Sequence, residues 1–296
     1  MRGFRARLAA PRRCPVYRYN RSTSLPAPRA NPAILAAMTL LALAMAMIGC
    51  NGTSRQNASA SSAMSSSLNA RGVQLATAGL VDDLLLAASA TGNGVMSQQE
   101  ALAMAKIDLA VSARTFESDY EANELAGDAK YKNKHFLLSG VIESIEKDFT
   151  GSGFLTLRSD NLLGVRAELN ERGTSGAGAL TKGTKIFLVC RSSDRIVGTE
   201  VAGDCQRLSQ YVDAIRPDLD RSVKEYLSGQ RAFPRKLGTV LTMMYVAGSH
   251  LPADSACSSQ VGDRCEQEVM KMAKDPAQAQ KVKAETEQML AKLQLN

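Results

Sequence analysis

The chain has 296 residues, of which 45% are hydrophobic and 22% are charged. This composition is typical of a protein that folds in water, and it excludes a disordered chain or a multispan membrane protein. There is no Trp, and His135 and His250 are the two histidines, so a histidine-based hydrolase or metal site is poorly supplied. The formal charge of +7 comes from residues 1–49, which hold eight Arg and no acid, and the remainder has 28 basic against 29 acidic side chains.

The first 49 residues have the order of a secretory signal, because an Arg-rich segment precedes an uncharged run over residues 33–49. The sequence Met47-Ile48-Gly49-Cys50 resembles the lipobox of bacterial lipoproteins, in which the Cys after the cut is lipidated. We therefore expect residues 1–49 to be a leader and Cys50 to carry the lipid. A leader of this length exceeds the usual 15–30 residues, and a translation start downstream, at Val16 or Leu25, would shorten it.

Residues 50–72 are rich in Ser, Asn, Ala and Gly, which predicts a flexible tether between the lipid and the folded body. The resemblance implies a protein of the bacterial cell envelope, lipid-anchored in the periplasm. Asn51 in place of Asp favours the outer over the inner membrane under the enterobacterial sorting rule. Two alternatives for residues 33–49 are an uncut membrane span and a core helix.

Four cysteines remain once Cys14 of the leader and Cys50 are set aside. An even number in an exported chain favours disulfides, and sequence proximity favours Cys190 with Cys205 and Cys257 with Cys265. Four cysteines allow three connectivities, and buried free thiols are the alternative. Neither a C-x-x-C motif nor a Cys/His cluster occurs, so we predict no metal site.

The region 73–114 is predicted to be helical. Residues 73–90 form an apolar helix that ends at a Gly-containing turn, and Ser97 with Glu100 forms a capping box. Apolar positions from Ala101 to Val111 extend this second helix. A third helix is predicted to follow Ser118, again from an S-x-x-E pattern.

The pattern then alternates with a period of two, which predicts strands. Five strand candidates are separated by turn residues, and they cover residues 135–147, 153–159, 163–169, 185–191 and 195–208. Between the third and the fourth, the glycines of residues 171–183 make a long helix unfavourable.

The region 209–296 is predicted to be helical. Pro217 and Pro276 suit first turns, and Asp275 suits the N-cap of a last helix over residues 276–293. The apolar segment 236–251 is interpreted as a helix buried against the barrel, with a Met-rich partner groove around Met243 and Met244 as the alternative.

A motif precedes the first strand and shows which family the chain resembles. The residues Tyr120, Asn123, Glu124, Asp128 and Tyr131, followed by Ser139-Gly140-Val141 and a late cysteine pair, resemble the tRNA-anticodon-like (tRNA_anti-like) OB-fold family of exported bacterial proteins. Gly127 stands where the family pattern has Ala. The resemblance covers residues 112–208 and implies an α+β fold, a five-stranded OB-type β-barrel over 115–208 flanked by helices at both ends.

The spacing of the motif places its residues on one side of a single helix. We expect a structural role, in which Asn123 and Asp128 bond to barrel backbone while Tyr120 and Tyr131 pack. The family name records a likeness in fold and does not indicate RNA binding.

OB-folds bind ligands across strands two and three. If Leu155, Leu157, Val165, Ala167 and Leu169 point inward, the opposite side carries Phe154, Thr156, Arg158, Arg166 and Glu168. Arg191 and Arg195 lie in the fourth loop. We predict that Phe154 and the four arginines form the ligand site, because guanidinium groups grip anions and an aromatic ring stacks on sugars. An ordinary solvated surface is the alternative.

We therefore expect a membrane-tethered envelope lipoprotein whose OB-fold binds a protein or a small anionic or oligosaccharide ligand, without catalysis or cofactor. Its expected partners are the lipid bilayer and an envelope protein, with no nucleic acid. A single-stranded nucleic-acid binder is the first alternative and an envelope enzyme of unknown class is the second. The two scattered histidines speak against an enzyme. The small number of aromatic residues speaks against a single-stranded nucleic-acid binder.

Overall fold

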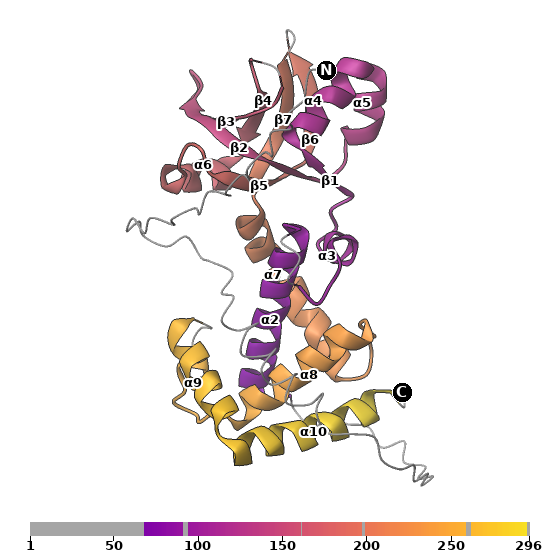
Figure 1. The fold of residues 1–296 in the computed structure, drawn as a ribbon, viewed down its shortest axis with the longest axis vertical. Coiled ribbons are helices and arrows are strands. Elements are labelled where there is room, and N and C mark those ends of the chain that lie inside the picture. The colour runs from indigo at the N-terminus through magenta and orange to yellow at the C-terminus, as the bar shows by residue number, and fades with distance from the viewer. Residues whose placement is uncertain (1–67, 91–93, 161, 197–198, 259–261, 295–296) are drawn as a thin grey trace, which may run out of the picture.

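The computed structural model describes residues 68–90, 94–160, 162–196, 199–258 and 262–294. A β-barrel occupies one end of the molecule and a group of helices the other, with α2 (Ala70–Ala88) running between them (Figure 1). The predicted leader, Cys50 and most of the tether lie outside the described residues. None of the helices in the ranges above is both long and apolar enough for a membrane crossing.

The helices are α2 (Ala70–Ala88), α3 (Gln98–Met104), α4 (Ala113–Ala122), α5 (Glu124–Tyr131), α6 (Glu171–Gly176), α7 (Leu208–Leu227), α8 (Arg235–His250), α9 (Asp263–Lys274) and α10 (Pro276–Gln294). The strands are β1 (Leu109–Ser112), β2 (Phe136–Lys147), β3 (Gly153–Leu157), β4 (Val165–Leu169), β5 (Lys185–Cys190), β6 (Ser192–Ile196) and β7 (Thr199–Arg207).

Five strands close the barrel in the order β2-β3-β4-β7-β5, and β5 returns to β2. The pairs are antiparallel except for β4 with β7, which run parallel. The long strand β2 pairs along its first half with β5 and along its second half with β3. The predicted α+β fold with an OB-type barrel is confirmed.

Two elements of the barrel differ from the sequence predictions, and a third agrees with the expectation that no long helix forms between the third and fourth predicted strands. Residues 109–112 form β1, which pairs in parallel with the start of β2, whereas the pattern predicted a continuing helix. The predicted fifth strand over 195–208 is a hairpin of β6 and β7. The short α6 lies in the Gly-rich connection between β4 and β5.

The motif helix is also divided, which corrects the prediction of one helix beginning after Ser118. α4 begins earlier, with Ser112 as its N-cap, and ends at Asn123. The Asn123 side chain then accepts from the Ala126 backbone N–H and caps α5. An extended Asn breaks the helix because its side chain replaces the missing backbone bond.

Aromatic side chains fill the barrel beneath α4 and α5. The rings of Phe116, Tyr120, Tyr131 and Phe136 lie within 6 Å of their neighbours, and none of the four is solvent-exposed. Gly127 packs on this cluster so closely that a Cβ there would stand 2.8 Å from the Tyr120 ring. The close approach explains why this chain has Gly rather than Ala.

The helical end is built on close packing of α2 against α8. A Cβ on Gly72 would stand 2.5 Å from the Tyr245 carbonyl oxygen, and one on Gly79 would overlap the Met244 side chain. Met243 and Met244 are 3% and 1% exposed, so residues 236–251 form a buried helix, and the alternative of an exposed Met-rich groove is wrong. This helix packs on α2 rather than on the barrel.

The remaining helix boundaries give two corrections and two confirmations. α2 begins at Ala70, capped by Asn69, so the predicted tether ends three residues too late. Pro217 lies inside α7 instead of in a first turn. Pro276 does begin α10, and the Asp275 carboxylate accepts from the backbone N–H groups of the first turn at 3.0 and 3.3 Å.

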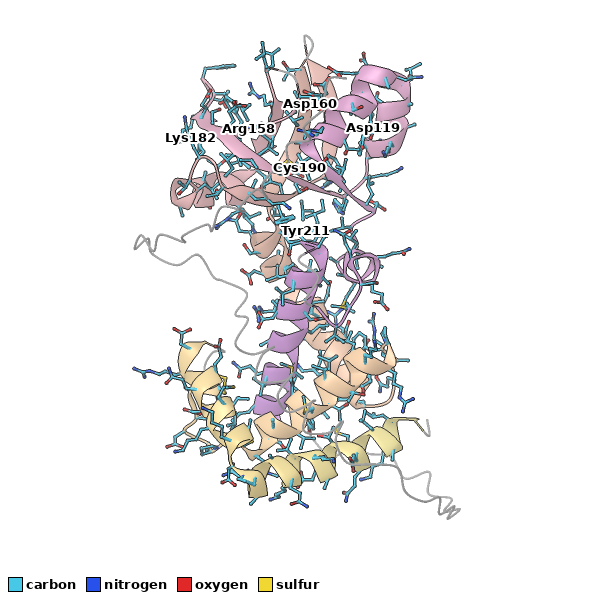
Figure 2. All side chains as sticks on the ribbon, in the orientation of Figure 1. Asp119, Arg158, Asp160, Lys182, Cys190 and Tyr211 are labelled. Carbon is cyan, nitrogen blue, oxygen red and sulfur yellow. A yellow bond between two sulfur atoms is a disulfide. The ribbon has the colours of Figure 1, made fainter. Side chains whose placement is uncertain are left out.

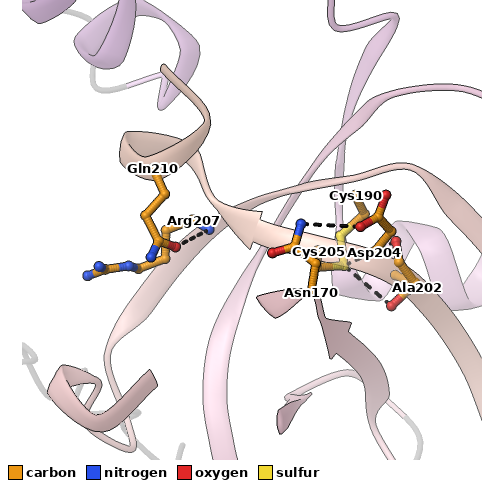
Figure 3. The surroundings of a disulfide bond; sticks show 8 residues. Asn170, Cys190, Ala202, Asp204, Cys205, Arg207 and Gln210 are labelled. Atoms are coloured by element: carbon orange, nitrogen blue, oxygen red, sulfur yellow. Dashed lines mark hydrogen bonds between the residues drawn. A yellow bond between two sulfur atoms is a disulfide. The ribbon is translucent and has the colours of Figure 1, made fainter. Parts of the chain in front are cut away.

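Both predicted disulfides are present. Cys190–Cys205 ties the end of β5 to β7, and Cys257–Cys265 ties a 3₁₀ turn to the start of α9. All four cysteines are buried. The surroundings of the first disulfide are shown in Figure 3, where Arg207 and Gln210 continue β7 into α7.

The barrel meets the helices through the outer side of β2 and β5. Leu137 and Val189 point away from the barrel interior and are buried in the helical core with Val212. The Tyr211 hydroxyl donates to the Ala105 carbonyl at 2.8 Å, at the junction shown in Figure 2. This attachment leaves β3 and β4 on another side of the barrel.

Candidate functional site

The candidate site is the outward surface of β3 and β4, called here the β3–β4 face and made of Phe154, Thr156, Arg166 and Glu168. The inward residues of both strands alternate with these and are buried. Phe154 pairs with Glu168, and Thr156 with Arg166, in the antiparallel register. The predicted alternation of these two strands is therefore confirmed, Leu169 included.

Arg166 and Phe154 form the centre of the face. The guanidinium carbon of Arg166 lies 4.0 Å from the centre of the Phe154 ring, and its Nε lies 3.1 Å from Oε1 of Glu168. A guanidinium stacked on an aromatic ring is stabilised by the ring's quadrupole. The ring and the two charges thus hold one another in a fixed arrangement, with the Arg166 side chain 34% exposed.

Strand β2 adds hydroxyl and carboxylate groups beside this centre. The Ser144 hydroxyl donates to Thr156 Oγ1 at 3.0 Å, and Glu146 is the cross-strand partner of Phe154. Glu168 is paired with Arg166, the charge of Arg166 acts on Asp148, and Glu146 neighbours Phe154, so three carboxylates lie on or next to the face. This charge balance disfavours a polyanion.

The turn between β2 and β3 presents an aromatic ring to solvent. Asp148 accepts from the Thr150 hydroxyl, the Thr150 N–H and the Ser152 N–H at 2.6, 2.8 and 3.0 Å. These hydrogen bonds, that of the Thr150 hydroxyl above all, and the charge of Arg166 hold the pKa of Asp148 below its usual range. The turn is therefore well ordered, yet Phe149 at its tip is fully exposed.

The predicted four-arginine site is not assembled. Of the arginines whose side chains the structure describes, Arg166 alone is shown against Phe154. Arg158 is exposed beyond the opposite end of β3, at the part of the barrel remote from Tyr211 (Figure 2). Arg191 follows Cys190, which pairs with Phe136 at the start of β2, whereas Phe154 pairs with Glu146 near the other end of that strand. Arg191 instead faces Asp204 at 3.9 Å.

Arg195 belongs to β6, which pairs with β7 on the side away from β4. Its side chain is outside what the structure describes. The alternation of a strand fixes which side of the sheet a residue faces, but it does not fix its distance around a barrel. This limit is why the sequence grouped arginines that the fold separates.

The motif residues have structural roles that differ in part from the prediction. Tyr120 and Tyr131 are packed, as expected. Asn123 caps α5, and Asp128 accepts from the Tyr120 hydroxyl at 3.2 Å, so bonding of these two side chains to barrel backbone is wrong. Glu124 is the exposed first residue of α5.

Tyr131 illustrates how the motif is held together. Its hydroxyl donates to Asp119, which also accepts from Lys130 at 2.6 Å. Burial and the hydrogen bond to Asp119 raise the pKa of the Tyr131 phenol far above its ordinary value. The phenol is therefore a hydrogen-bond donor at every physiological pH.

Sequence reasoning missed two residues around the face. Glu117 on α4 is 1% exposed and accepts from Ser159 Oγ and the Asp160 N–H at 2.5 and 3.0 Å, which fixes the loop after β3. Phe149 is the other. The Asp148-to-Ser152 turn pattern could have identified Phe149 as an exposed aromatic, whereas no sequence signal indicated the burial of Glu117.

The chemistry available at this face is recognition by an aromatic ring, a guanidinium, hydroxyls and carboxylates. Within the described ranges, no group of three or more His, Cys, Asp or Glu side chains is placed to hold a metal ion. His250 bonds to Glu285 at 2.7 Å and His135 packs edge-on to Tyr211. Each histidine thus contacts a residue that does not belong to the β3–β4 face.

Comparison with known proteins adds the family. A solved structure from Klebsiella pneumoniae subsp. pneumoniae MGH 78578, described as a candidate nucleic acid-binding lipoprotein, is 19% identical, with 36% of this chain and 95% of that chain covered. Its TM-score of 0.29 is too low to support an argument. No curated protein matches the chain. The tRNA_anti-like family matches residues 33–202, which include β1 to β6 and the start of β7. Because this match spans more than half of the sequence, the chain belongs to the tRNA_anti-like family.

Proposed function

We propose that this protein is a lipid-anchored, non-catalytic binding module of the bacterial envelope, and that its barrel contacts a protein partner through the β3–β4 face and Phe149. Three sequence features support the anchor: the Arg-rich start, the apolar run over 33–49, and the lipobox-like residues before Cys50. Two disulfides support an oxidising compartment. The outer membrane is the proposed location.

The direction of α2 supports presentation of the barrel away from the bilayer. The described chain begins beside α8, where the Asn69 N–H donates to the Tyr245 hydroxyl at 3.1 Å. α2 then runs from the helical end toward the barrel (Figure 1). A lipid on Cys50 would thus tether the helical end, and the barrel would reach outward to a partner.

The observation that carries the partner proposal is the fully exposed Phe149 on a turn fixed by Asp148, beside the stack of Arg166 on Phe154. Large rigid aromatics and Arg are the side chains enriched at the centres of protein interfaces. A sugar would have to displace Arg166 to stack on Phe154. The carboxylates of Glu146, Asp148 and Glu168 would repel phosphates.

Photo-crosslinking in the native host tests the partner. A benzophenone amino acid at position 149 should give a discrete protein adduct that nuclease leaves intact. The same amino acid at Leu125, which is 81% exposed on α5, is the matched control and should give none. An adduct that nuclease removes would assign the face to nucleic acid instead.

Complementation tests whether the face matters in the cell. Phe149→Ala with Arg166→Ala should leave the free energy of unfolding within about 1–2 kcal/mol of wild type, since both changes are at the surface, yet abolish complementation of a deletion strain. Arg221→Ala, which removes an exposed pair with Asp218 on α7, should complement fully. A double variant that folds and complements would show that the face is inert.

The anchor has its own test. Intact-mass analysis of membrane-fraction protein should find cleavage after Gly49 and a lipid on Cys50, and Cys50→Ala should release the protein from this fraction. An unaltered mass in the wild-type protein would remove the lipoprotein proposal.

A further inference from the structure

A cavity of about 560 Å³ lies at the helical end, far from the β3–β4 face. It is formed where the α7–α8 turn meets the C-terminal part of α10, near the C-terminus in Figure 1. Its volume is within the range of about 300–1,000 Å³ that is usual for small-molecule sites. The lining residues that carry the argument are Tyr226, Arg231, Phe233, Arg235, Leu290 and Leu293.

One part of the lining is cationic. The Nη1 of Arg231 donates to Ser222 Oγ at 2.9 Å and lies 3.6 Å from Glu225, and its guanidinium carbon lies 5.5 Å from the centre of the Phe233 ring. These contacts fix the side chain in position. Arg235 is the exposed first residue of α8, on a helix start where Pro234 gives no side-chain cap. The two guanidiniums outnumber the one carboxylate paired with Arg231, so this part of the lining keeps a net positive charge that favours a singly charged anion.

The other part of the lining is apolar. The Tyr226 hydroxyl is hydrogen-bonded to Thr242 Oγ1 at 2.9 Å in the interior, so its polar group is satisfied and its ring serves as a wall. Phe233 packs on this ring with centroids 5.3 Å apart. Leu290 and Leu293 of α10 complete the apolar side.

We propose that this cavity binds a single-chain amphiphile with an acidic head, carboxylate or phosphate, and an alkyl tail. The head would pair with Arg231 and Arg235, because planar guanidiniums bind such oxygens through paired hydrogen bonds. The tail would lie against Tyr226, Phe233 and the two leucines. This site is separate from the β3–β4 face, and it does not depend on the function proposed for that face.

Calorimetry on residues 50–296 with Cys50→Ala tests the site, since this segment contains every described residue. Decanoate should bind with a 1:1 ratio, and 1-decanol and acetate, which lack the charge or the tail, should each bind at least tenfold more weakly. Arg231→Gln with Arg235→Gln should weaken decanoate at least tenfold. Arg221→Gln, an arginine of the same helical end outside the cavity lining, should leave it unchanged.

A second variant separates loss of binding from loss of folding. Ala232→Phe adds a ring to an exposed lining residue and should block decanoate while leaving the melting temperature unchanged. Equal affinity for decanol and decanoate would overturn the proposal, as would equal weakening by Arg221→Gln. Binding to phosphatidylglycerol vesicles without binding of free decanoate would also overturn it, because it would show a surface attraction to lipid headgroups.

Discussion

Asp82 lies half-buried on α2 at a place where three helices meet, and its ionisation should limit the stability of the fold. Burial, and then the charge of Glu266 on α9, raise the pKa of this carboxyl from 3.8 to about 6, against the opposing charge of Arg216 on α7. The folded protein therefore holds a proton that the unfolded chain has already released between about pH 4 and 6. Stability contributed by this group falls as the pH rises through that window.

The size of the effect follows from the two pKa values. A rise from 3.8 to about 6 corresponds to about 3 kcal/mol of penalty above pH 6, at 1.36 kcal/mol for each tenfold change in the equilibrium. Asp82→Asn removes the charge while it keeps the shape of the side chain. The pKa of about 6 already includes the attraction to Arg216, and the Asn amide keeps a desolvation cost of its own. We therefore expect a net stabilisation of about 1–3 kcal/mol at pH 7.5 and almost none at pH 4.

Urea unfolding followed by circular dichroism at pH 4, 6 and 7.5 measures this difference. The adjacent Asp83 is the matched control. Its pKa is also raised by burial, but its carboxylate accepts from the Val95 and Met96 backbone N–H groups, so Asp83→Asn should destabilise at pH 7.5. The reasoning is refuted if Asp82→Asn changes stability equally at pH 4 and 7.5, or destabilises at the higher pH.

Two further changes test packing and covalent links. Gly127→Ala should destabilise by about 1–2 kcal/mol, because overpacking against the buried Tyr120 ring costs more than the roughly 1 kcal/mol of helix propensity that Ala adds. Gly178→Ala is the control and should be neutral, since a Cβ there meets nothing within 4 Å. Equal effects of the two changes would refute the close-approach argument. Removing the Cys190–Cys205 disulfide with two Ala changes should cost about 3 kcal/mol for a loop of 15 residues. A reductant should lower the urea midpoint of the wild type, and an unchanged midpoint would contradict this.

The sequence predicted the barrel where local pattern and fold agree. β3 and β4 alternate strictly between buried and outward residues, so inside and outside were assigned correctly for Phe154 and Arg166. The prediction of a helix over residues 109–112 was wrong because Leu109 and Val111 fit the continuation of an apolar helix as well as a strand. Its pairing with Phe136–Ser139 is parallel and distant in sequence, and local periodicity carries no information on such a partner.

Other differences come from side chains that replace backbone hydrogen bonds. Asn123 ends one helix and caps the next, although the residues around it fit one continuous helical face. Pro217 is accommodated inside α7, whereas its lack of an N–H suggested a helix start. In both cases the choice between two locally acceptable positions depends on packing of the flanking helices, which a single sequence does not show.

The candidate site shows what charge counting omits. One aromatic ring and four arginines suggested an anion site, yet in the fold Arg166 pairs with Glu168 and Arg191 faces Asp204. Arg166 is stacked and paired before any ligand arrives, so it contributes shape and fixed hydrogen-bond donors more than net attraction. Recognition at the β3–β4 face should therefore depend on complementary contacts around Phe149 and Phe154, and only weakly on ionic strength.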